Sequence, residues 1–208
     1  MKALLLVDIQ NDFCSGGALE VKNGDEVVEV ANKLIEIFSK KNKLIIATKD
    51  FHPKNHKSFA INSNKKIGEI GTLNGIEQVF WPVHCVENTV GSDFHKNLRT
   101  DKIDKTIYKG TNSEVDSYSG FFENDKKSKT ELDTFLKNNN VDTLYILGLA
   151  TDYCVKFTVL DALDLGYKVF LIKDGCRAIS ENELAIDEMK KIGAKIIYSD
   201  EIEKDQNF

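Results

Sequence analysis

The segment Val141–Gly166, VDTLYILGLATDYCVKFTVLDALDLG, predicts a strand, a tight turn and a helix in direct succession. Leu144–Leu147 is a short apolar run that suits a buried strand, and Gly148–Tyr153 is small and polar, as a tight turn requires. Apolar side chains then recur at helical spacing, at Val155, Val159, Ala162 and Leu163. A strand that leads through a turn into a helix is the repeating unit of α/β proteins with a parallel sheet.

Alternating strand and helix patterns continue through almost the whole chain and predict an α/β fold. Between the first two strand-like runs, one helical stretch carries an apolar face at Val27, Val28, Ala31, Leu34, Ile35 and Phe38. We expect a single domain over residues 1–208, with a doubly wound, Rossmann-like, mostly parallel six-stranded sheet and helices on both faces. Its strands are predicted at Ala3–Val7, Leu44–Thr48, Thr106–Tyr108, Leu144–Leu147, Val169–Ile172 and Lys195–Tyr198.

Two S-x-x-E motifs predict the starts of helices. They lie at Ser128–Glu131 and Ser180–Glu183, and each precedes a helical stretch. In such a capping box, the serine and glutamate side chains bond to backbone N–H groups that the first helical turn leaves free.

The segment from residue 51 to 104 has weak periodicity, and we expect a long loop region there that contributes to a metal or substrate site. It contains all four histidines, the only tryptophan and both prolines of the chain. A loop of this length inside a compact domain is usually functional or disordered. The histidines and aromatic side chains favour function.

Composition and charge weigh against several kinds of partner. The 208 residues carry a net charge of −5 without a basic stripe, which argues against nucleic-acid binding. No segment approaches the ~20 apolar residues of a membrane span, and the run Ala3–Val7 is too short for a signal peptide. The four cysteines form no C-x-x-C pair, so we expect reduced thiols and a cytoplasmic protein.

Reactive side chains follow four of the predicted strands. Asp8 comes directly after the first strand, Asp50 two residues after the second, and Lys109 directly after the third. The fourth strand leads through its turn to Cys154. Ligands of open parallel sheets bind outside the carboxyl ends of the strands, so we expect these groups to converge there.

Cys154 is the leading candidate for a nucleophile. Its place at a helix N-terminus favours thiolate, which would lower the pKa of the thiol below the ~8.5 of free cysteine. Asp8 could take its proton and return it to a leaving group, while the Lys109 ammonium stabilises the thiolate. Backbone N–H groups around Ala150 and Cys154 would form an oxyanion hole. The alternative is an inert buried cysteine, as most free cysteines are.

Asp50, His52 and His84 form a candidate metal site. Residues i and i+2 of an extended segment point the same way, so Asp50 and His52 could bind one ion together with a histidine of the long loop. Three protein ligands leave positions open for water or substrate. His56 could be a fourth ligand or a substrate contact, whereas His95 suits the surface. The motif D-x-H is a weak signal by itself and is usually surface chemistry.

Aromatic side chains could line a pocket for a flat ring. Phe13, Trp81, Tyr118 and Phe121 are the candidates, and aromatic faces would hold a heteroaromatic ring by offset stacking. The alternative is that these side chains are ordinary core residues.

With these residues in view, the chain resembles the nicotinamidases of the isochorismatase-like cysteine hydrolase family over nearly its full length. The resemblance rests on VDIQNDFCSGGAL (7–19), TKDFHPKNHKSFA (48–60), WPVHC (81–85), YKGTNSEVDSYSGF (108–121) and LGLATDYCVKFT (147–158). It implies a catalytic triad and a metal site, made of Asp8, Lys109 and Cys154 and of Asp50, His52 and His84. It also implies that Phe13 and Trp81 sandwich the substrate ring, that Tyr118 and Ala150 line the pocket, and that the Leu149–Ala150 peptide is cis.

The resemblance implies a reaction as well. Nicotinamide and water would give nicotinate and ammonia through a thioester, a step in NAD salvage, and pyrazinamide would also be accepted. One divalent ion would bind the pyridine nitrogen; we expect zinc, with iron or manganese as alternatives. Phe51 departs from the tryptophan of many relatives, and neither Glu69 nor Asp93 has motif support as a further acidic ligand.

Two other functions stay open at this stage. A related amidase could act on another small amide or carbamoyl compound. The chain could also be a non-catalytic, redox-sensing thiol protein with the same sheet, although Cys154 has no resolving cysteine close in sequence. The roles of Cys14, Cys85 and Cys176 and the oligomeric state are not determined, and a homo-oligomer is compatible with the sequence.

Overall fold

The computed structural model describes residues 1–180 and 184–204 and contains all six predicted strands in one sheet. The strands are β1 (Lys2–Val7), β2 (Leu44–Asp50), β5 (Lys105–Lys109), β6 (Thr143–Leu149), β7 (Lys168–Arg177) and β8 (Lys195–Ile197). Their order is β5-β2-β1-β6-β7-β8, and every neighbouring pair is parallel. Numbered along the chain, this is the 3-2-1-4-5-6 order of doubly wound sheets, so the predicted fold class is confirmed.

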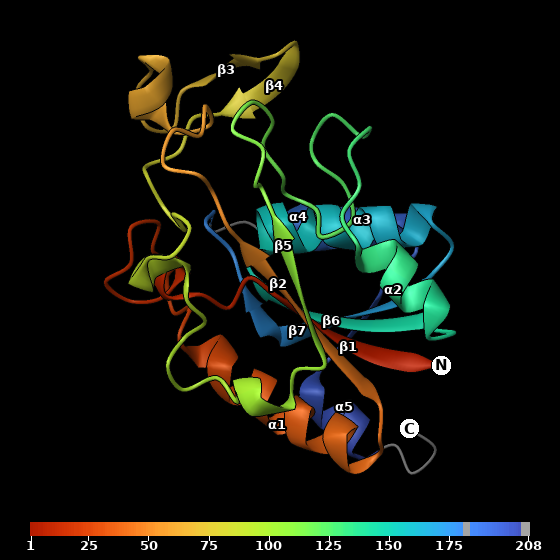
Figure 1. Cartoon of the computed structure of the whole chain (residues 1–208). Coiled ribbons are helices and arrows are strands. Elements are labelled where there is room, and N and C mark those ends of the chain that lie inside the picture. The colour runs from red at the N-terminus through yellow and green to blue at the C-terminus, as the bar shows by residue number, and fades with distance from the viewer. Residues whose placement is uncertain (181–183, 205–208) are drawn as a thin grey trace.

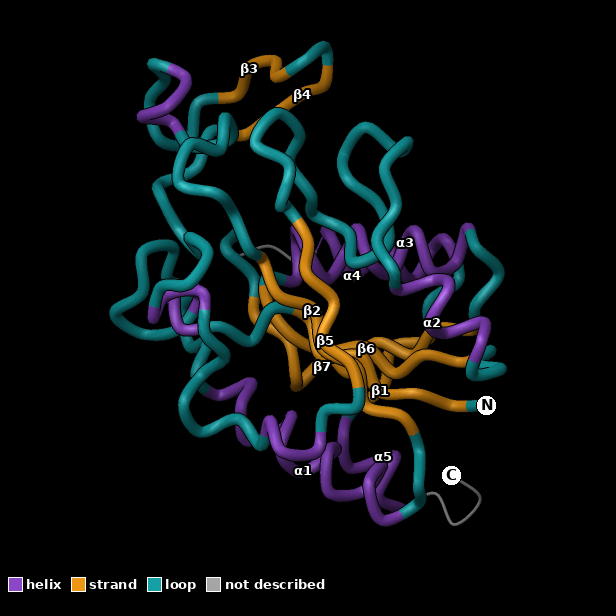
Figure 2. Tube along the Cα trace, in the orientation of Figure 1, coloured by secondary structure: helices purple, strands orange, loops and turns teal. Residues whose placement is uncertain are grey.

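Helices cover both faces of the sheet (Figures 1 and 2). One face packs against α1 (Glu26–Lys40) and α5 (Ser199–Lys204). The other lies under α2 (Leu132–Asn138), α3 (Lys156–Asp164) and α4 (Leu184–Ile192). The apolar face predicted for α1 is buried at each position, Val27, Val28, Ala31, Leu34, Ile35 and Phe38. In the part of the chain that the structure describes, no helix has the length and apolar character needed to cross a membrane.

The two central strands, β1 and β6, set the position of a ligand site. Every residue of β6 is buried, and β1 is buried from Ala3 onward. β1 pairs with β2 on one side and with β6 on the other, so the strand order reverses between β1 and β6. A crevice forms outside the carboxyl ends of strands at such a switch point.

Four strands extend beyond their predicted C-terminal ends: β2, β5, β6 (to Leu149 instead of Leu147) and β7 (to Arg177 instead of Ile172). β8 ends one residue earlier than predicted, at Ile197. The expected ends of β2 and β5 were Thr48 and Tyr108, but β2 continues to Asp50 and β5 to Lys109. The parallel register pairs Asp50 with Lys109, and Lys109 Nζ lies 2.9 Å from Asp50 Oδ1. Opposite charges on neighbouring strands are favourable, which accounts for the ladder continuing through two polar residues.

The long segment after β2 contains regular structure that the sequence patterns did not predict. A two-stranded antiparallel hairpin is formed by β3 (Ile70–Leu73) and β4 (Ile76–Val79). Asn74 and Gly75 connect these strands with positive φ values of 50° and 82°. An Asn-Gly pair is the usual sequence of a type I′ hairpin turn. The same segment contains three short 3₁₀ helices. One lies before the hairpin, at Ala60–Ser63, and two lie after it, at Val90–Ser92 and Thr100–Lys102.

The capping box predicted at Ser128–Glu131 is wrong. α2 begins later, at Leu132, and the Thr130 hydroxyl accepts the Leu132 N–H at 3.1 Å. Ser128 instead joins a turn in which its carbonyl accepts the Glu123 N–H. The second box, Ser180–Glu183, lies partly outside the described residues.

We predict that Leu34→Ala lowers the free energy of unfolding by about 2–5 kcal/mol, because the fully buried Leu34 joins α1 to the sheet and truncation leaves a cavity. Urea denaturation followed by circular dichroism measures the change. Glu29→Ala, at an exposed position of the same helix, is the matched control and should change stability by less than about 0.5 kcal/mol. Equal losses in the two variants would contradict the packing described for α1.

Candidate active site

Asp8, Lys109 and Cys154 meet beyond the carboxyl ends of the sheet. Asp8 follows β1, Lys109 is the last residue of β5, and Cys154 lies in a π-helical turn, Thr151–Val155, that leads into α3. Lys109 Nζ is 2.9 Å from Asp8 Oδ2 and 3.5 Å from Cys154 Sγ. All three residues are buried. The structure therefore brings together the three groups that were predicted to converge.

Lys109 carries a permanent charge in this site. Its Nζ also donates to Asp50 Oδ1 and to the Ser117 carbonyl, both at 2.9 Å. Burial lowers the pKa of Lys109, but the charges of Asp50 and Asp8 outweigh this effect and raise the pKa well above its usual value. A buried ammonium is tolerated when several acceptors share its protons, as here.

The pKa of the Cys154 thiol departs from the expectation of a helix N-terminus. Burial raises this pKa well above its usual value, the Lys109 ammonium lowers it, and the carboxylates of Asp8 and Asp50 raise it further. Burial is the largest of these effects, and it outweighs the lowering by Lys109. The expected lowering of the pKa by the helix terminus alone is therefore wrong.

Asp8 is held in a form suited to accepting a proton. Burial raises the pKa of its carboxyl, Lys109 lowers it and Asp50 raises it. The Thr48 hydroxyl donates to Asp8 Oδ1 at 2.5 Å and accepts the Asp8 N–H at 3.2 Å. Asp8 has a positive φ of 48°, a region that aspartate tolerates better than most residues. Thr48 thus fixes the carboxyl, a role that no motif in the sequence indicated.

Asp50, His52 and His84 lie together beside this cluster. Asp50 Oδ2 is 3.3 Å from His52 Nε2 and 3.5 Å from His84 Nε2. The Nδ1 atoms of the two histidines are 2.9 Å from the Gly110 carbonyl and 2.8 Å from the Pro82 carbonyl. Each Nδ1 therefore donates its proton to a carbonyl, and each Nε2 presents a lone pair toward Asp50.

These three residues fit a divalent cation. His52 Nε2 is buried and makes no hydrogen bond, an arrangement that a bound cation would satisfy. Burial raises the pKa of Asp50, but nearby positive charge, including the Lys109 ammonium 2.9 Å from its Oδ1, lowers it well below its usual value, so the carboxylate stays ionised. One carboxylate and two imidazoles suit zinc, iron or manganese.

His56, the fourth ligand candidate, lies against His52 with 4.4 Å between ring centroids. Its Nδ1 accepts hydrogen bonds from the Ser58 N–H at 3.1 Å and from the Ser58 hydroxyl at 2.7 Å, and its Nε2 is 3.3 Å from the Val115 carbonyl. Burial and the neighbouring His52 lower the pKa of His56 to about 4, so the ring is neutral. Because both ring nitrogens already have hydrogen-bond partners, His56 is better placed to support the His52 ring than to bind a metal ion.

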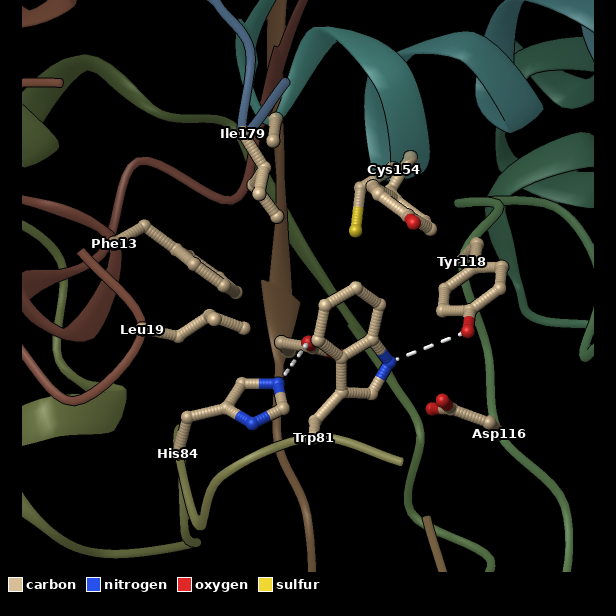
Figure 3. A pocket seen from close by; sticks show the side chains of 11 residues that line it. Phe13, Leu19, Trp81, His84, Asp116, Tyr118, Cys154 and Ile179 are labelled. Carbon is tan, nitrogen blue, oxygen red and sulfur yellow. Dashed lines mark hydrogen bonds and ion pairs between the residues drawn. The ribbon is translucent and has the colours of Figure 1, made fainter. Parts of the chain in front are cut away.

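A small pocket, partly open to solvent, joins the two clusters. In Figure 3 the Cys154 sulfur points into the space that Phe13, Trp81 and Tyr118 border. Ala150 also lines the pocket, and the Leu149–Ala150 peptide is cis, as the resemblance implied. Phe121, the remaining aromatic candidate, is buried in the core instead.

The pocket is also lined by four residues that were not predicted, Leu19, Asp116, Tyr153 and Ile179, and Gln78 lies behind them as a hydrogen-bond partner of Asp116. Gln78 is a buried residue of β4. Gln78 Nε2 donates to Asp116 Oδ2 at 2.7 Å and lies 3.2 Å from the Tyr118 hydroxyl, which also accepts the Trp81 Nε1–H at 3.2 Å. Recognition of the Asn-Gly hairpin would have indicated that an inward-facing side chain of β4 reaches the site.

Comparison with known proteins assigns the chain to a family. A switch-point crevice with a buried thiol, ammonium and carboxyl is the site of a hydrolase-type α/β protein. The chain belongs to the isochorismatase family, since residues 2–201 match the isochorismatase domain. It is 49% identical to the nicotinamidase of Escherichia coli over 199 residues, which cover 94% of this chain and 93% of that protein.

Solved structures agree with this assignment. The nicotinamidase/pyrazinamidase of Acinetobacter baumannii superposes with a TM-score of 0.92 at 38% identity, over 97% of each chain. A pyrazinamidase of Pyrococcus horikoshii in complex with zinc superposes with a TM-score of 0.80 at 39% identity, over 95% of this chain and 98% of that chain.

We predict that the purified protein retains about one tightly bound divalent ion per chain after desalting, and that His84→Ala weakens its binding by more than ~100-fold. Loss of a residue that only hydrogen-bonds to a metal ligand typically lowers metal affinity by about 10–100-fold, and loss of a ligand itself should lower it further. Elemental analysis and competition with a chelator measure both values. His95→Ala, outside this cluster, is the control and should keep the tightly bound ion; equal metal content in wild type and His84→Ala would refute the assignment.

Proposed function

We propose that this protein is a nicotinamidase that hydrolyses nicotinamide to nicotinate and ammonia, and that it also accepts pyrazinamide. The observation that carries the proposal is the meeting of the Cys154 thiol, the Asp8 carboxyl and the Lys109 ammonium at an aromatic pocket beside a cluster of metal-type ligands. The similarity to nicotinamidases and pyrazinamidases over almost the whole chain supports it. The reaction belongs to NAD salvage and to the cytoplasm, where the four free cysteines would stay reduced.

The substrate ring would bind between Phe13 and Trp81, with Tyr118 and Ala150 completing the pocket. Asp50, His52 and His84 would hold one divalent ion, for which we propose zinc. When bound, this ion supplies a Lewis-acid partner for the pyridine nitrogen and offsets the negative charge of Asp50. Reduced negative charge near Cys154 favours the thiolate that the reaction needs.

Cys154 and Asp8 would carry the covalent chemistry. The Cys154 sulfur attacks the carboxamide carbon, and its proton passes to Asp8. The backbone N–H groups of Ala150 and Cys154 stabilise the oxyanion. Asp8 gives its proton to the nitrogen, the C–N bond breaks, and ammonia leaves a thioester on Cys154. Asp8 then takes a proton from water, which attacks the thioester and releases nicotinate and the free thiol.

Lys109 has two roles in these reaction steps. Its ammonium, shared between Asp8 and Cys154, stabilises the thiolate and holds the carboxyl in place. Because its other protons go to Asp50 and Ser117, its position is fixed before substrate binds.

We predict that Cys154→Ala lowers kcat for ammonia release from nicotinamide by at least ~10³-fold, since loss of a nucleophile removes the covalent route. Cys176→Ala, at another buried thiol away from the pocket, is the matched control and should remain within a few-fold of wild type. Assays use the metal-loaded protein with nicotinamide, pyrazinamide and a panel of small amides and carbamoyl compounds. Near-normal turnover by Cys154→Ala would refute the proposal; nicotinamide inert beside another active amide would favour the related amidase.

We predict that Thr48→Val lowers kcat by roughly 10–100-fold with a smaller change in KM, because the variant keeps the shape of Thr48 but releases the Asp8 carboxyl. Thr48→Ser retains the hydroxyl and should recover most of the activity. Steady-state kinetics and thermal unfolding are measured on the same samples. Loss of stability with unchanged kcat in Thr48→Val would show that Thr48 serves the fold and not Asp8.

A further inference from the structure

A second group of potential metal ligands lies outside the pocket and consists of Cys14, Asp25 and His95. Cys14 follows the 3₁₀ helix Asn11–Phe13, Asp25 directly precedes α1, and His95 comes from the long segment before β5. One ligand atom from each side chain lies within 4.8 Å of the other two. The proposed catalytic and metal-binding residues contribute nothing to this group.

The contacts of Asp25 orient the group. Asp25 Oδ2 accepts hydrogen bonds from the Ser15 N–H at 2.9 Å and from the Ser15 hydroxyl, which leaves Oδ1 facing His95 Nε2 at 3.3 Å. These bonds from Ser15 lower the pKa of the Asp25 carboxyl, so it is ionised at neutral pH. Cys14 is buried, the His95 side chain is 11% exposed and that of Asp25 is 42% exposed, so the group borders solvent.

We propose that Cys14, Asp25 and His95 form a second cation site, which takes a thiophilic divalent ion of the zinc type. A thiolate, an imidazole and a carboxylate are three of the usual zinc donors, and a water would complete a tetrahedron. Metal–ligand bonds of that kind place the donors about 3.3–3.8 Å apart in a tetrahedral site. The Asp25–His95 separation of 3.3 Å already has this value, and the Cys14 sulfur needs to approach the other two atoms by up to about 1.5 Å.

Binding at this site has a definite proton balance. The ion displaces the Cys14 thiol proton to solvent as the metal–sulfur bond forms. Burial, followed by the Asp25 charge, raises the pKa of Cys14 to about 12, so this displacement is unfavourable at neutral pH. His95 must also move its proton from Nε2 to Nδ1 and give up the 3.3 Å hydrogen bond from the Asn97 N–H. Because binding releases the Cys14 proton, the affinity of the second site for metal should rise with pH.

An ion bound here would act on the pocket through one loop. Cys14 and Asp25 are the two ends of the segment 14–25, and the ion would tie these ends together and to His95. Leu19 of this segment lines the pocket, as does Phe13 directly before it (Figure 3). Occupation of the second site should thus restrict the loop that forms one wall of the pocket.

The test uses cobalt(II), which replaces zinc and gives a charge-transfer absorption band when a thiolate binds it. The metal-loaded protein with Cys154→Ser is titrated, because this variant removes a thiol whose sulfur lies within 4.8 Å of an Asp50 carboxylate oxygen. Three further substitutions are made in that background: Cys14→Ser and His95→Gln, which remove ligands of the second site, and Cys176→Ser, which removes a buried thiol elsewhere. Circular dichroism checks the fold of each protein.

We expect a saturable thiolate band in the parent protein and in the Cys176→Ser variant, reduced by at least tenfold in the Cys14→Ser and His95→Gln variants. His84→Ala in the same background should leave the band intact.

The absence of a band at saturating cobalt would show that the three side chains hold the loop by hydrogen bonds alone and would overturn the proposal. A band that survives both Cys14→Ser and His95→Gln would do the same. If Cys14→Ser does not fold, the His95→Gln result decides by itself. None of these outcomes depends on amide hydrolysis.

Discussion

The buried ammonium of Lys109 is the interaction on which the whole site depends. Its Nζ lies 2.9 Å from both Asp8 Oδ2 and Asp50 Oδ1 and 3.5 Å from Cys154 Sγ. A buried cation needs several acceptors, and Lys109 has four within 3.5 Å, the two carboxylates, the Ser117 carbonyl and Cys154 Sγ. Lys109 therefore joins the two groups of the proposed covalent chemistry to the carboxylate of the proposed metal site. The positive charge of Lys109 keeps the two buried carboxylates close together, and the same charge would stabilise a Cys154 thiolate.

The sheet explains why these groups can meet. β1 pairs with β2 and β6, and the register places Val7 beside Gly148. A side chain on Gly148 would lie only 2.0 Å from the Val7 carbonyl oxygen, and this glycine has a φ of 137°. Glycine at this position therefore lets the end of β6 stay against β1 while the chain turns toward Cys154. Asp8 and Cys154 consequently reach the same crevice from adjacent strands.

Sequence patterns predicted the position of every strand of the six-stranded sheet because most of these strands contain a central apolar run. They failed where polar side chains are stabilised only by tertiary contacts. Asp50 and Lys109 extend their strands because they pair with each other, and Thr48 orients Asp8 across two strands. The Cys154 thiol shows the limit most clearly. Helix position alone predicts a lowered pKa, but burial and nearby carboxylates raise it, and neither is visible in a linear sequence.

The proposed reaction requires that the Cys154 sulfur form a covalent bond to the acyl group of the substrate. Rapid acid quenching of the metal-loaded protein during turnover of nicotinamide, followed by peptide mass spectrometry, tests this requirement directly. We expect one nicotinoyl group on the peptide that contains Cys154, lost on treatment with hydroxylamine as a thioester should be. The proposed mechanism would be contradicted by a nicotinoyl group on Cys14, Cys85 or Cys176. It would also be contradicted by unmodified Cys154 in a protein quenched during active turnover.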